Sequence, residues 1–362
     1  MKAYVLEAIG KLTYKEVEKP ILKQGEALIR VEAAGICGSD IPRIYETGAY
    51  YFPLIPGHEF SGTVEAVFEE KHKDWIGKRV GIFPLIPCRS CSSCSEESYE
   101  TCHHYGYLGS RQDGGFGEYA AVPVWNLIEL PETISFEEAA MLEPASVALH
   151  AVRRLIPELC GTAGGDYPDL TGKTVALLGL GTIGGIMVQW LAYYGVKRVL
   201  ATGHGKEPGL LMKRCASENY DYREVTGQET AEWLMKETDG EGAHMVIDCL
   251  GTSGALEDAL MCVKNGGRIL IVGNPHGGIS LPKEIYWKLL RKQVTICGTW
   301  NSSFTHREED DWHMVIRACC EGKLKLKELI TQKLPFEELS AALDFKRNRK
   351  QYQNKVMIVR HM

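Results

Sequence analysis

The stretch that most constrains the fold of this chain is residues 171–203, which read TGKTVALLGLGTIGGIMVQWLAYYGVKRVLATG. A short apolar segment leads into a glycine turn, a segment with helical spacing follows, and a second apolar segment ends the unit. The turn carries a G-x-G-x-x-G pattern formed by Gly179, Gly181 and Gly184. Glycine there permits a tight turn and the close approach of a pyrophosphate to a helix N-terminus. The stretch therefore predicts a dinucleotide-binding unit, and the alternative is a glycine turn without a ligand.

Two later apolar segments extend this pattern into a larger sheet. They read HMVIDCLG (244–251) and GRILIVGNP (267–275), and a helix-compatible stretch precedes each. Alternating strands and helices are typical of an α/β fold with a doubly wound parallel sheet. Besides the three glycines of the turn, the residues that we expect along the cofactor are Thr182, Ile183, Gly251, Val272, Gly273 and Thr299.

The residues after the second apolar segment of the unit bear on the choice of cofactor. A carboxylate at that place would hold the ribose hydroxyls of NAD, but the chain has Gly203, His204, Gly205 and Lys206. A small residue with nearby cations tolerates the 2′-phosphate of NADP. The pattern favours NADP over NAD, with the alternative that His204 and Lys206 are solvated loop residues.

Length and composition predict a soluble globular chain with two domains. The chain has 362 residues, of which 44% are hydrophobic and 24% charged, with a net charge of −6. This charge gives no reason to expect nucleic acid or an anionic membrane as a partner. We see no signal-peptide pattern and no apolar stretch of membrane-spanning length, so we expect a cytoplasmic protein. In a reducing compartment, most of the twelve cysteines should be buried thiols or metal ligands.

Four cysteines lie close together in the loop CRSCSSCSEESYETC. Cys88, Cys91, Cys94 and Cys102 have the spacing C-x2-C-x2-C-x7-C. Four thiolates on a short loop can close a tetrahedron around one Zn²⁺ and leave no position open for a substrate. The alternative is a group of reduced, unliganded cysteines, which would be prone to oxidation. The spacing predicts a structural zinc site.

A catalytic metal needs a different set of ligands, and the N-terminal part of the chain offers candidates. Cys37, His58, Glu59 and Glu143 supply sulfur, nitrogen and oxygen donors of the kind that a catalytic zinc uses. Each has a simpler explanation when taken alone. Cys37 could be a buried thiol, His58 a hydrogen-bonded turn residue and Glu143 an acid that stabilises a helix start.

These motifs together resemble the zinc-containing medium-chain dehydrogenases over nearly the whole chain. Within that family the sequence is most similar to the polyol branch, on the segments GICGSDIPRIYETGAYYFPLIPGHEFSG, PLIPCRSCSSCSEESYETC, YLGSRQDGGFGEYAAVP, EPASVALHA and GTWNSS. The resemblance implies a mostly-β, GroES-like catalytic domain at residues 1–155 and a Rossmann domain at 156–297. Residues 298–362 would return to the catalytic domain, and the active site would lie in the cleft between the domains.

The resemblance also assigns roles to the candidate residues. Cys37, His58 and Glu143 would hold the catalytic zinc. Glu59 would be a fourth ligand, or would hydrogen-bond to a ligand or to water at the metal. Ser39 would relay the substrate proton, although a helix-capping role for it is equally compatible with the sequence. Many relatives carry a histidine five residues after the zinc cysteine, whereas this chain has Pro42, so its proton must leave by another route.

The implied reaction is oxidation of a secondary hydroxyl with hydride transfer to NAD or NADP. The substrate would be a polyol phosphate similar to galactitol 1-phosphate, which would become a ketose phosphate. Arg43 and Arg111 would bind the phosphate unless they form ion pairs instead, and Trp300 and Asn301 would line the substrate site. The alternatives are an unphosphorylated polyol such as sorbitol, L-threonine, or a non-enzymatic zinc protein. The resemblance further implies two zinc ions per chain and a homodimer or homotetramer.

Overall fold

The chain folds into two units, each of which is described here by itself. The computed structural model describes residues 1–160, 167–215, 219–225, 229–275, 277–348 and 352–360. The first unit comprises residues 1–144, 303–321 and 330–362, and the second comprises 145–302 and 322–329. The domain limits expected at 155 and 297 both lie within the second unit. In the described ranges no helix combines the length and apolar character that crossing a membrane requires.

The first unit is built mostly from β-strands. Its main sheet has seven strands, paired in the order β16-β17-β3-β4-β5-β9, with β8 pairing to β3. The sheet is therefore completed by strands from the C-terminal part of the chain. The strands of this unit are β1 (Lys2–Ala8), β2 (Lys11–Glu16), β3 (Glu26–Gly35), β4 (Glu59–Val67), β5 (Arg79–Ile82), β6 (Leu85–Ile86), β7 (Gly106–Tyr107), β8 (Tyr119–Pro123), β9 (Leu127–Glu129), β16 (Ile330–Pro335) and β17 (Lys355–Val359).

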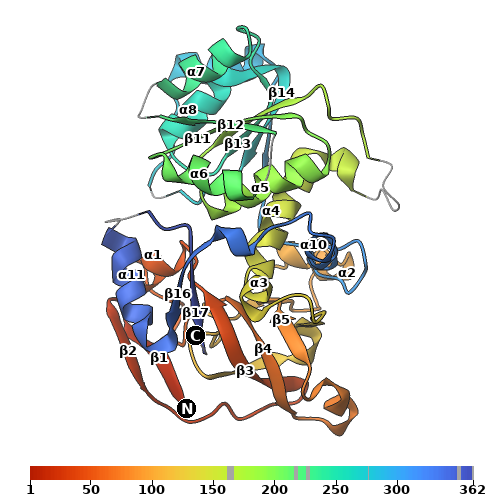
Figure 1. The fold of residues 1–362 in the computed structure, drawn as a ribbon, viewed down its shortest axis with the longest axis vertical. Helices are drawn as coiled ribbons and strands as arrows, with labels where there is room; N and C mark the ends of the chain where they lie inside the picture. Colours follow the sequence, from red (N-terminus) through yellow and green to blue (C-terminus); the bar gives the residue numbers. More distant parts are fainter. Residues whose placement is uncertain (161–166, 216–218, 226–228, 276, 349–351, 361–362) are drawn as a thin grey trace. The chain divides into compact units, whose positions relative to one another are not determined.

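Short helices connect these strands (Figure 1). The α-helices of the first unit are α1 (Asp40–Tyr45), α2 (Ser92–Ser95), α3 (Phe136–Ala140), α10 (Asp311–Cys320) and α11 (Leu339–Asn348), and α4 (Leu142–Leu155) continues into the second unit. The 3₁₀ helices are η1 (Glu70–Trp75), η2 (Tyr99–Thr101), η3 (Val124–Asn126) and η6 (Phe336–Glu338). Alternating side chains of β3, such as Ala27, Ile29 and Val31, are buried in the core of this unit.

The second unit has the doubly wound parallel sheet that the sequence predicts. Its six strands follow the order β12-β11-β10-β13-β14-β15, and every pairing is parallel. The strands are β10 (Thr174–Leu178), β11 (Arg198–Gly203), β12 (Tyr220–Glu224), β13 (Ala243–Asp248), β14 (Val263–Ile271) and β15 (Thr295–Gly298). The central strands are continuous apolar runs because helices cover both faces of the sheet.

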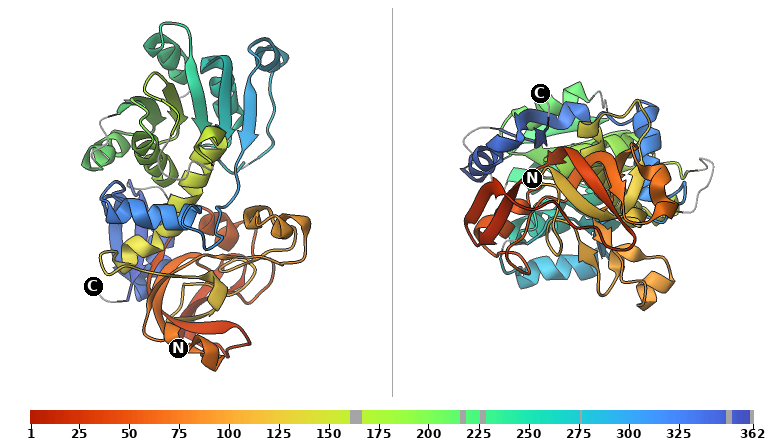
Figure 2. Two further views of the ribbon diagram at one scale, coloured as in Figure 1. Left: turned by 90° about the vertical axis from the view of Figure 1, so that its right-hand side faces the viewer. Right: turned by 90° about the horizontal axis from the view of Figure 1, so that it is seen from below.

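The helices of the second unit lie on both sides of this sheet, with α5 and α6 on one side and α7 and α8 on the other (Figures 1 and 2). They are α5 (Thr182–Tyr193), α6 (Glu207–Arg214), α7 (Glu229–Glu237), α8 (Ser253–Cys262) and α9 (Lys283–Arg291), with the 3₁₀ helices η4 (Pro157–Leu159) and η5 (Lys327–Leu329). This arrangement leaves the strand-to-helix turns at the carboxyl ends of the strands, where such folds bind ligands.

Candidate active site and nucleotide pocket

Three of the predicted metal ligands meet where β3 ends and β4 begins. The two strands are antiparallel with Gly35 opposite Glu59, so Cys37, just after β3, lies near His58, just before β4. The Cys37 sulfur, one ring nitrogen of His58 and a carboxylate oxygen of Glu59 all lie within 4.8 Å of one another. Gly35 makes this possible, because a Cβ at that position would overlap Oε2 of Glu59.

A buried lysine contacts the same carboxylate. Lys355, at the start of β17, places its Nζ against Oε2 of Glu59, and the two side chains are only 4% and 1% exposed. The lysine also donates to the carbonyl oxygen of Ile36 at 3.4 Å. Although burial would lower the pKa of Lys355, the charges of Glu59 and Cys37 raise it above its usual value. Lys355 is therefore a charged partner that holds Glu59 in place.

Asp40 organises the opposite side of the cluster. Its carboxylate accepts hydrogen bonds from the backbone N–H of Cys37 at 2.9 Å and from Nη1 of Arg43 at 2.8 Å. Nδ1 of His58 lies 3.6 Å from Oδ1 of Asp40. Burial would lower the pKa of His58, but the charges of Cys37 and Asp40 raise it well above its usual value. The surroundings of this histidine thus favour a positive charge.

Ser39 and Glu143 lie beside the cluster in different ways. The Ser39 hydroxyl is 3.3 Å from the Cys37 sulfur and makes no capping hydrogen bond to α1. Glu143 is buried, but it falls outside the group formed by Cys37, His58 and Glu59. It accepts a hydrogen bond of 3.1 Å from the hydroxyl of Tyr107, whose ring centroid is 5.8 Å from that of His58. Burial raises the pKa of the Glu143 carboxyl.

The donor atoms of this cluster fit a zinc ion. Sulfur, imidazole nitrogen and carboxylate oxygen are the donors that catalytic zinc takes, and three protein ligands leave a position for substrate. Nδ1 of buried His58 has no hydrogen-bond partner among the described residues. A thiol, an imidazole and a carboxylate that converge in this way can serve together as ligands of one cation. Cys37, His58 and Glu59 would hold the metal, with Glu143 as a neighbouring carboxylate.

The four-cysteine loop forms a second, separate cluster. The sulfur atoms of Cys88, Cys91, Cys94 and Cys102 lie within 4.8 Å of one another. Hydrogen bonds from Ser90 lower the pKa of the Cys88 thiol to about 5, which favours the thiolate that zinc binds. Four sulfur donors at this separation fit a closed, tetrahedral zinc site.

In the second unit, the glycines of the predicted turn have distinct local roles. Gly179 follows β10 with a φ of +100°, and a Cβ there would lie 2.7 Å from the side chain of Leu250. A Cβ on Gly184 would lie 2.6 Å from the carbonyl oxygen of Gly179, so the helix could not pack so closely. At Gly181, the N-cap of α5, nothing lies within 4 Å of the Cβ position. The first turn of α5, with Thr182 and Ile183, thus opens onto free space that fits a phosphate group.

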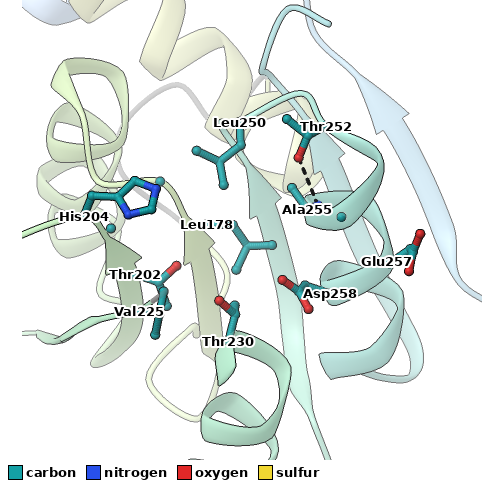
Figure 3. Close-up of a pocket in the computed structure, with 13 residues that line it drawn as sticks. Leu178, Thr202, His204, Val225, Thr230, Leu250, Thr252, Ala255, Glu257 and Asp258 are labelled. Atoms are coloured by element: carbon teal, nitrogen blue, oxygen red, sulfur yellow. Dashed lines mark hydrogen bonds between the residues drawn. The ribbon is translucent and has the colours of Figure 1, made fainter. Parts of the chain in front are cut away.

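A pocket of about 390 Å³ adjoins this turn at the carboxyl ends of β10 and β11 (Figure 3). In Figure 3 the side chains of Leu178, Thr230 and Asp258 point towards its middle, whereas Glu257 points away. Gly203 and His204 line the pocket, as expected for residues along a cofactor, but Lys206 is not among its lining residues and forms the N-cap of α6. The volume suits the adenosine part of a nucleotide.

The remaining predicted cofactor residues surround neighbouring turns. The backbone segments at Gly251 and Gly273 approach each other closely. A Cβ on Gly251 would be 2.6 Å from the carbonyl oxygen of Gly273. The Val272 N–H donates to the carbonyl oxygen of Asp248 at 2.9 Å. Oγ1 of Thr299 is buried without a hydrogen-bond partner among the described residues. Such an atom has unused capacity for a polar ligand.

The predicted substrate residues differ in how freely they could bind a phosphate. Arg43 is mostly buried and paired with Asp40. The guanidinium carbon of Arg111 lies 4.0 Å from the ring centroid of Tyr50 and 4.4 Å from that of Tyr105, and Arg111 donates a hydrogen bond to the Tyr50 hydroxyl. Trp300 is 52% exposed, and Nδ2 of Asn301 has no hydrogen-bond partner in the described part of the chain.

Comparisons with known proteins agree with this geometry. Residues 23–132 match the model of the alcohol dehydrogenase GroES-like domain, and residues 182–319 match that of zinc-binding dehydrogenases. Galactitol 1-phosphate 5-dehydrogenase of Escherichia coli (strain K12) is 31% identical over 96% of this chain and 97% of that enzyme. The chain belongs to the zinc-containing medium-chain dehydrogenases. It is a zinc-dependent oxidoreductase of the alcohol and polyol class, as its sequence predicts.

Other relatives of this dehydrogenase differ in substrate. Sorbitol dehydrogenase of Bacillus subtilis (strain 168) is 28% identical over 95% of this chain and 93% of that enzyme. The crystal structure of galactitol-1-phosphate dehydrogenase from Escherichia coli superimposes with a TM-score of 0.86, covering 99% of this chain and 100% of that one at 31% identity. A structure described as a short chain alcohol dehydrogenase from Escherichia coli CFT073, complexed with NADH, has the same TM-score at 26% identity and covers 99% of each chain. The comparisons support a nicotinamide cofactor and a small-molecule substrate.

Three residues of the dehydrogenase site were not predicted from the sequence. Asp40 follows Ser39 directly, and only the fold reveals that it contacts Arg43 and His58. Tyr107 lies in a tyrosine-rich stretch without a distinguishing pattern. Lys355 had a usable signal, because a charged residue opens the fully buried strand KVMIV, and such a lysine needs a partner.

Proposed function

We propose that this dehydrogenase oxidises a secondary hydroxyl of a polyol phosphate to a ketone, with hydride transfer to the nicotinamide of NADP. The observation that carries the proposal is the cluster of Cys37, His58 and Glu59, with the Ser39 hydroxyl beside the Cys37 sulfur. The relative of 31% identity that acts on galactitol 1-phosphate supports a phosphorylated substrate.

The residues in and around the cluster would have three different roles, which are metal binding, proton transfer and positioning of the ligands. Zinc held by Cys37, His58 and Glu59 would supply Lewis acidity that stabilises negative charge on the substrate oxygen. Ser39 would accept the hydroxyl proton at its Oγ and pass it on. Lys355 and Asp40 would hold Glu59 and His58 in fixed orientations, because each contacts one of these side chains.

Arg111 is the better candidate for the substrate phosphate. Arg43 already pairs with the buried carboxylate of Asp40, so recruiting it for the phosphate would break a buried ion pair. The guanidinium of Arg111 contacts the rings of Tyr50 and Tyr105 and donates one hydrogen bond to the Tyr50 hydroxyl, and these contacts restrict its orientation. A pre-oriented guanidinium can donate to two phosphate oxygens together.

The test is a substrate panel with a matched pair of arginine variants. Galactitol 1-phosphate, galactitol, sorbitol and threonine would be assayed with the wild type, Arg111→Ala and Arg347→Ala. Arg347 is also stacked on a tyrosine, at 4.7 Å from the Tyr45 ring centroid, but it is not a candidate for the substrate site. We expect Arg111→Ala to raise the KM for the phosphate about tenfold or more and Arg347→Ala to leave it unchanged. Equal turnover of galactitol and its phosphate by the wild type would contradict the proposal and favour a free polyol.

Two features support NADP as the preferred cofactor. Gly203 leaves no carboxylate at the position where one would repel a 2′-phosphate, and His204 lines the adjoining pocket. Lys206 is exposed one residue before α6 begins. We expect His204→Ala and Lys206→Ala each to weaken NADP about tenfold and to leave NAD unchanged. Lys213→Ala, at the exposed end of α6, is the control, and loss of affinity for both cofactors alike would contradict the assignment.

We also infer that the enzyme forms a homodimer through β15. This strand is the edge of the parallel sheet, and its Ile296 is 38% exposed. The neighbouring helix α9 exposes Tyr286, Trp287 and Leu290 by 50%, 47% and 60%. An apolar sheet edge of this kind favours pairing with another strand. Sedimentation of the wild type should give a dimer, or a tetramer built as a dimer of dimers, and Ile296→Lys should give a smaller species. A wild-type monomer would contradict the inference.

We place the enzyme in the reducing cytoplasm. All twelve cysteines are free thiols in the structure, including the four of the zinc loop. Stable disulfides are rare in that compartment, and thiolate zinc sites depend on reduced cysteines. Fractionation of cells that produce the protein would test this, and recovery outside the cytoplasm would contradict it.

A further inference from the structure

A second pocket of about 390 Å³ lies in the second unit at the amino ends of the parallel strands. We call it the basal pocket, and its lining residues are Ile156, Glu158, Pro168, Asp169, Leu170, Lys173, His244, Met245, Lys264, Asn265, Gly266, Gly267 and Arg268. Lys173 lies just before β10, and His244 lies at the start of β13, whereas the nucleotide pocket adjoins the other ends of these strands. The basal pocket is therefore separate from the cofactor site.

The acidic groups of the basal pocket are already satisfied. Both oxygens of Glu158 accept hydrogen bonds from the guanidinium of Arg268, at 3.1 and 3.0 Å. Oδ1 of Asp169 accepts from the backbone N–H and the hydroxyl of Thr171, at 2.9 and 2.7 Å. These contacts hold both carboxylates in place and neutralise Arg268.

The basic groups are not satisfied in the same way. Lys173 and Lys264 form no ion pair within 4 Å in the described part of the chain; Lys173 is exposed and Lys264 is half-buried. The hydrogen bonds from Thr171 and, to a lesser degree, the charge of Lys173 lower the pKa of the Asp169 carboxyl. The charges of both lysines act on His244, since burial, Lys264 and Lys173 together lower the pKa of its imidazole. Lys173, Lys264 and Arg268 carry three positive charges against the two negative charges of Glu158 and Asp169. The pocket therefore has a net positive charge, which an anion would relieve.

His244 adds one hydrogen-bond donor to the pocket, the N–H at Nε2. Its Nδ1 accepts the backbone N–H of Thr174 at 3.1 Å. The neutral ring must therefore carry its proton on Nε2, which leaves that N–H for another acceptor. Asn265 contributes an amide to the same wall. The pocket thus combines two cations with neutral donors, a combination that suits phosphate oxygens.

We propose that the basal pocket binds a small phosphate-bearing anion through Lys173, Lys264 and His244. Its volume lies at the lower end of the range for small-molecule sites, so it admits inorganic phosphate or a phosphorylated metabolite of modest size. The bound anion would tie the segment before β10 to the starts of β13 and β14 and so stabilise the second unit.

The test is calorimetric titration of inorganic phosphate into the zinc-loaded enzyme saturated with NADP, so that the cofactor site is occupied. The test variant is Lys173→Gln/Lys264→Gln. Lys213→Gln/Lys236→Gln removes the same charge from exposed positions of the same unit, and Arg111→Ala removes the proposed substrate phosphate contact. We expect saturable binding to the wild type and to both controls, and affinity at least tenfold weaker in the test variant.

Three results would overturn the proposal. The first is the absence of saturable phosphate binding in the wild type, and the second is equal affinity in the test variant and the wild type. Loss of binding in Arg111→Ala alone would likewise overturn it, since it would assign the phosphate to the substrate site. Unchanged NADP affinity in the test variant would show that the lost binding does not come from unfolding of the second unit.

Discussion

Replacing Lys355 with methionine tests how the buried ion pair supports the metal cluster. Lys355→Met keeps most of the side-chain volume but removes the charge that faces Glu59, and both side chains are at most 4% exposed. Breaking a buried pair by removing one partner costs about 3–5 kcal/mol, because the remaining charge stays buried without compensation. Two charges 4 Å apart interact by about 4 kcal/mol at an effective dielectric constant of 20, which agrees with that range.

Amide hydrogen exchange of β3 and β4, measured in the presence of a chelator, reports the opening free energy of the first unit without a contribution from bound metal. We expect Lys355→Met to lower it by about 3–5 kcal/mol and Glu59→Gln/Lys355→Met to recover most of the loss. The control is Lys333→Met, which breaks the exposed pair with Glu137 and should cost no more than about 1 kcal/mol. Equal losses in Lys355→Met and Lys333→Met would refute the reasoning.

Two further predictions concern other parts of the chain. Cys88→Ser should lower the zinc content by about one ion per chain and remove exchange protection from residues 88–102 while β10 and β11 keep theirs; an unchanged zinc content would refute a four-thiolate site. Burial and the charge of Glu257 raise the pKa of Asp258 from 3.8 to about 6, so the folded carboxyl holds its proton more tightly than the unfolded chain does. The second unit should therefore lose stability as pH rises from 3.8 to about 6, and Asp258→Asn should flatten that dependence in urea unfolding series; parallel curves for the two proteins would disagree with this.

The parts of the fold that could be predicted from the sequence are those encoded by local patterns. The glycine turn is one such case, because its spacing is a local pattern and Gly184 packs against the carbonyl oxygen of Gly179, five residues before it. The four cysteines are another, since their spacing alone brings them onto one loop. Parallel pairing followed from the alternation of apolar strands and helices.

The rest depended on contacts between distant parts of the chain. Lys355 and Glu59 are separated by 296 positions, and they meet only because β17 pairs with β3 beside β4. The grouping of the carboxylates also depends on the fold. Glu143 accepts a hydrogen bond from Tyr107 and lies outside the group of Cys37, His58 and Glu59, and its role as a zinc ligand stays a prediction. Short spacing patterns carry no information about which of several acids completes a cluster.

The most direct test of the enzymatic account is zinc content and hydride transfer measured together in the wild type and Cys37→Ala. We predict two zinc ions per chain and reduction of NADP by a polyol phosphate in the wild type. Cys37→Ala should keep the zinc of the four-cysteine loop and lose the other ion. Its turnover rate should fall by a factor on the order of 10³ or more. A Cys37→Ala protein with two zinc ions and an undiminished rate would contradict the account.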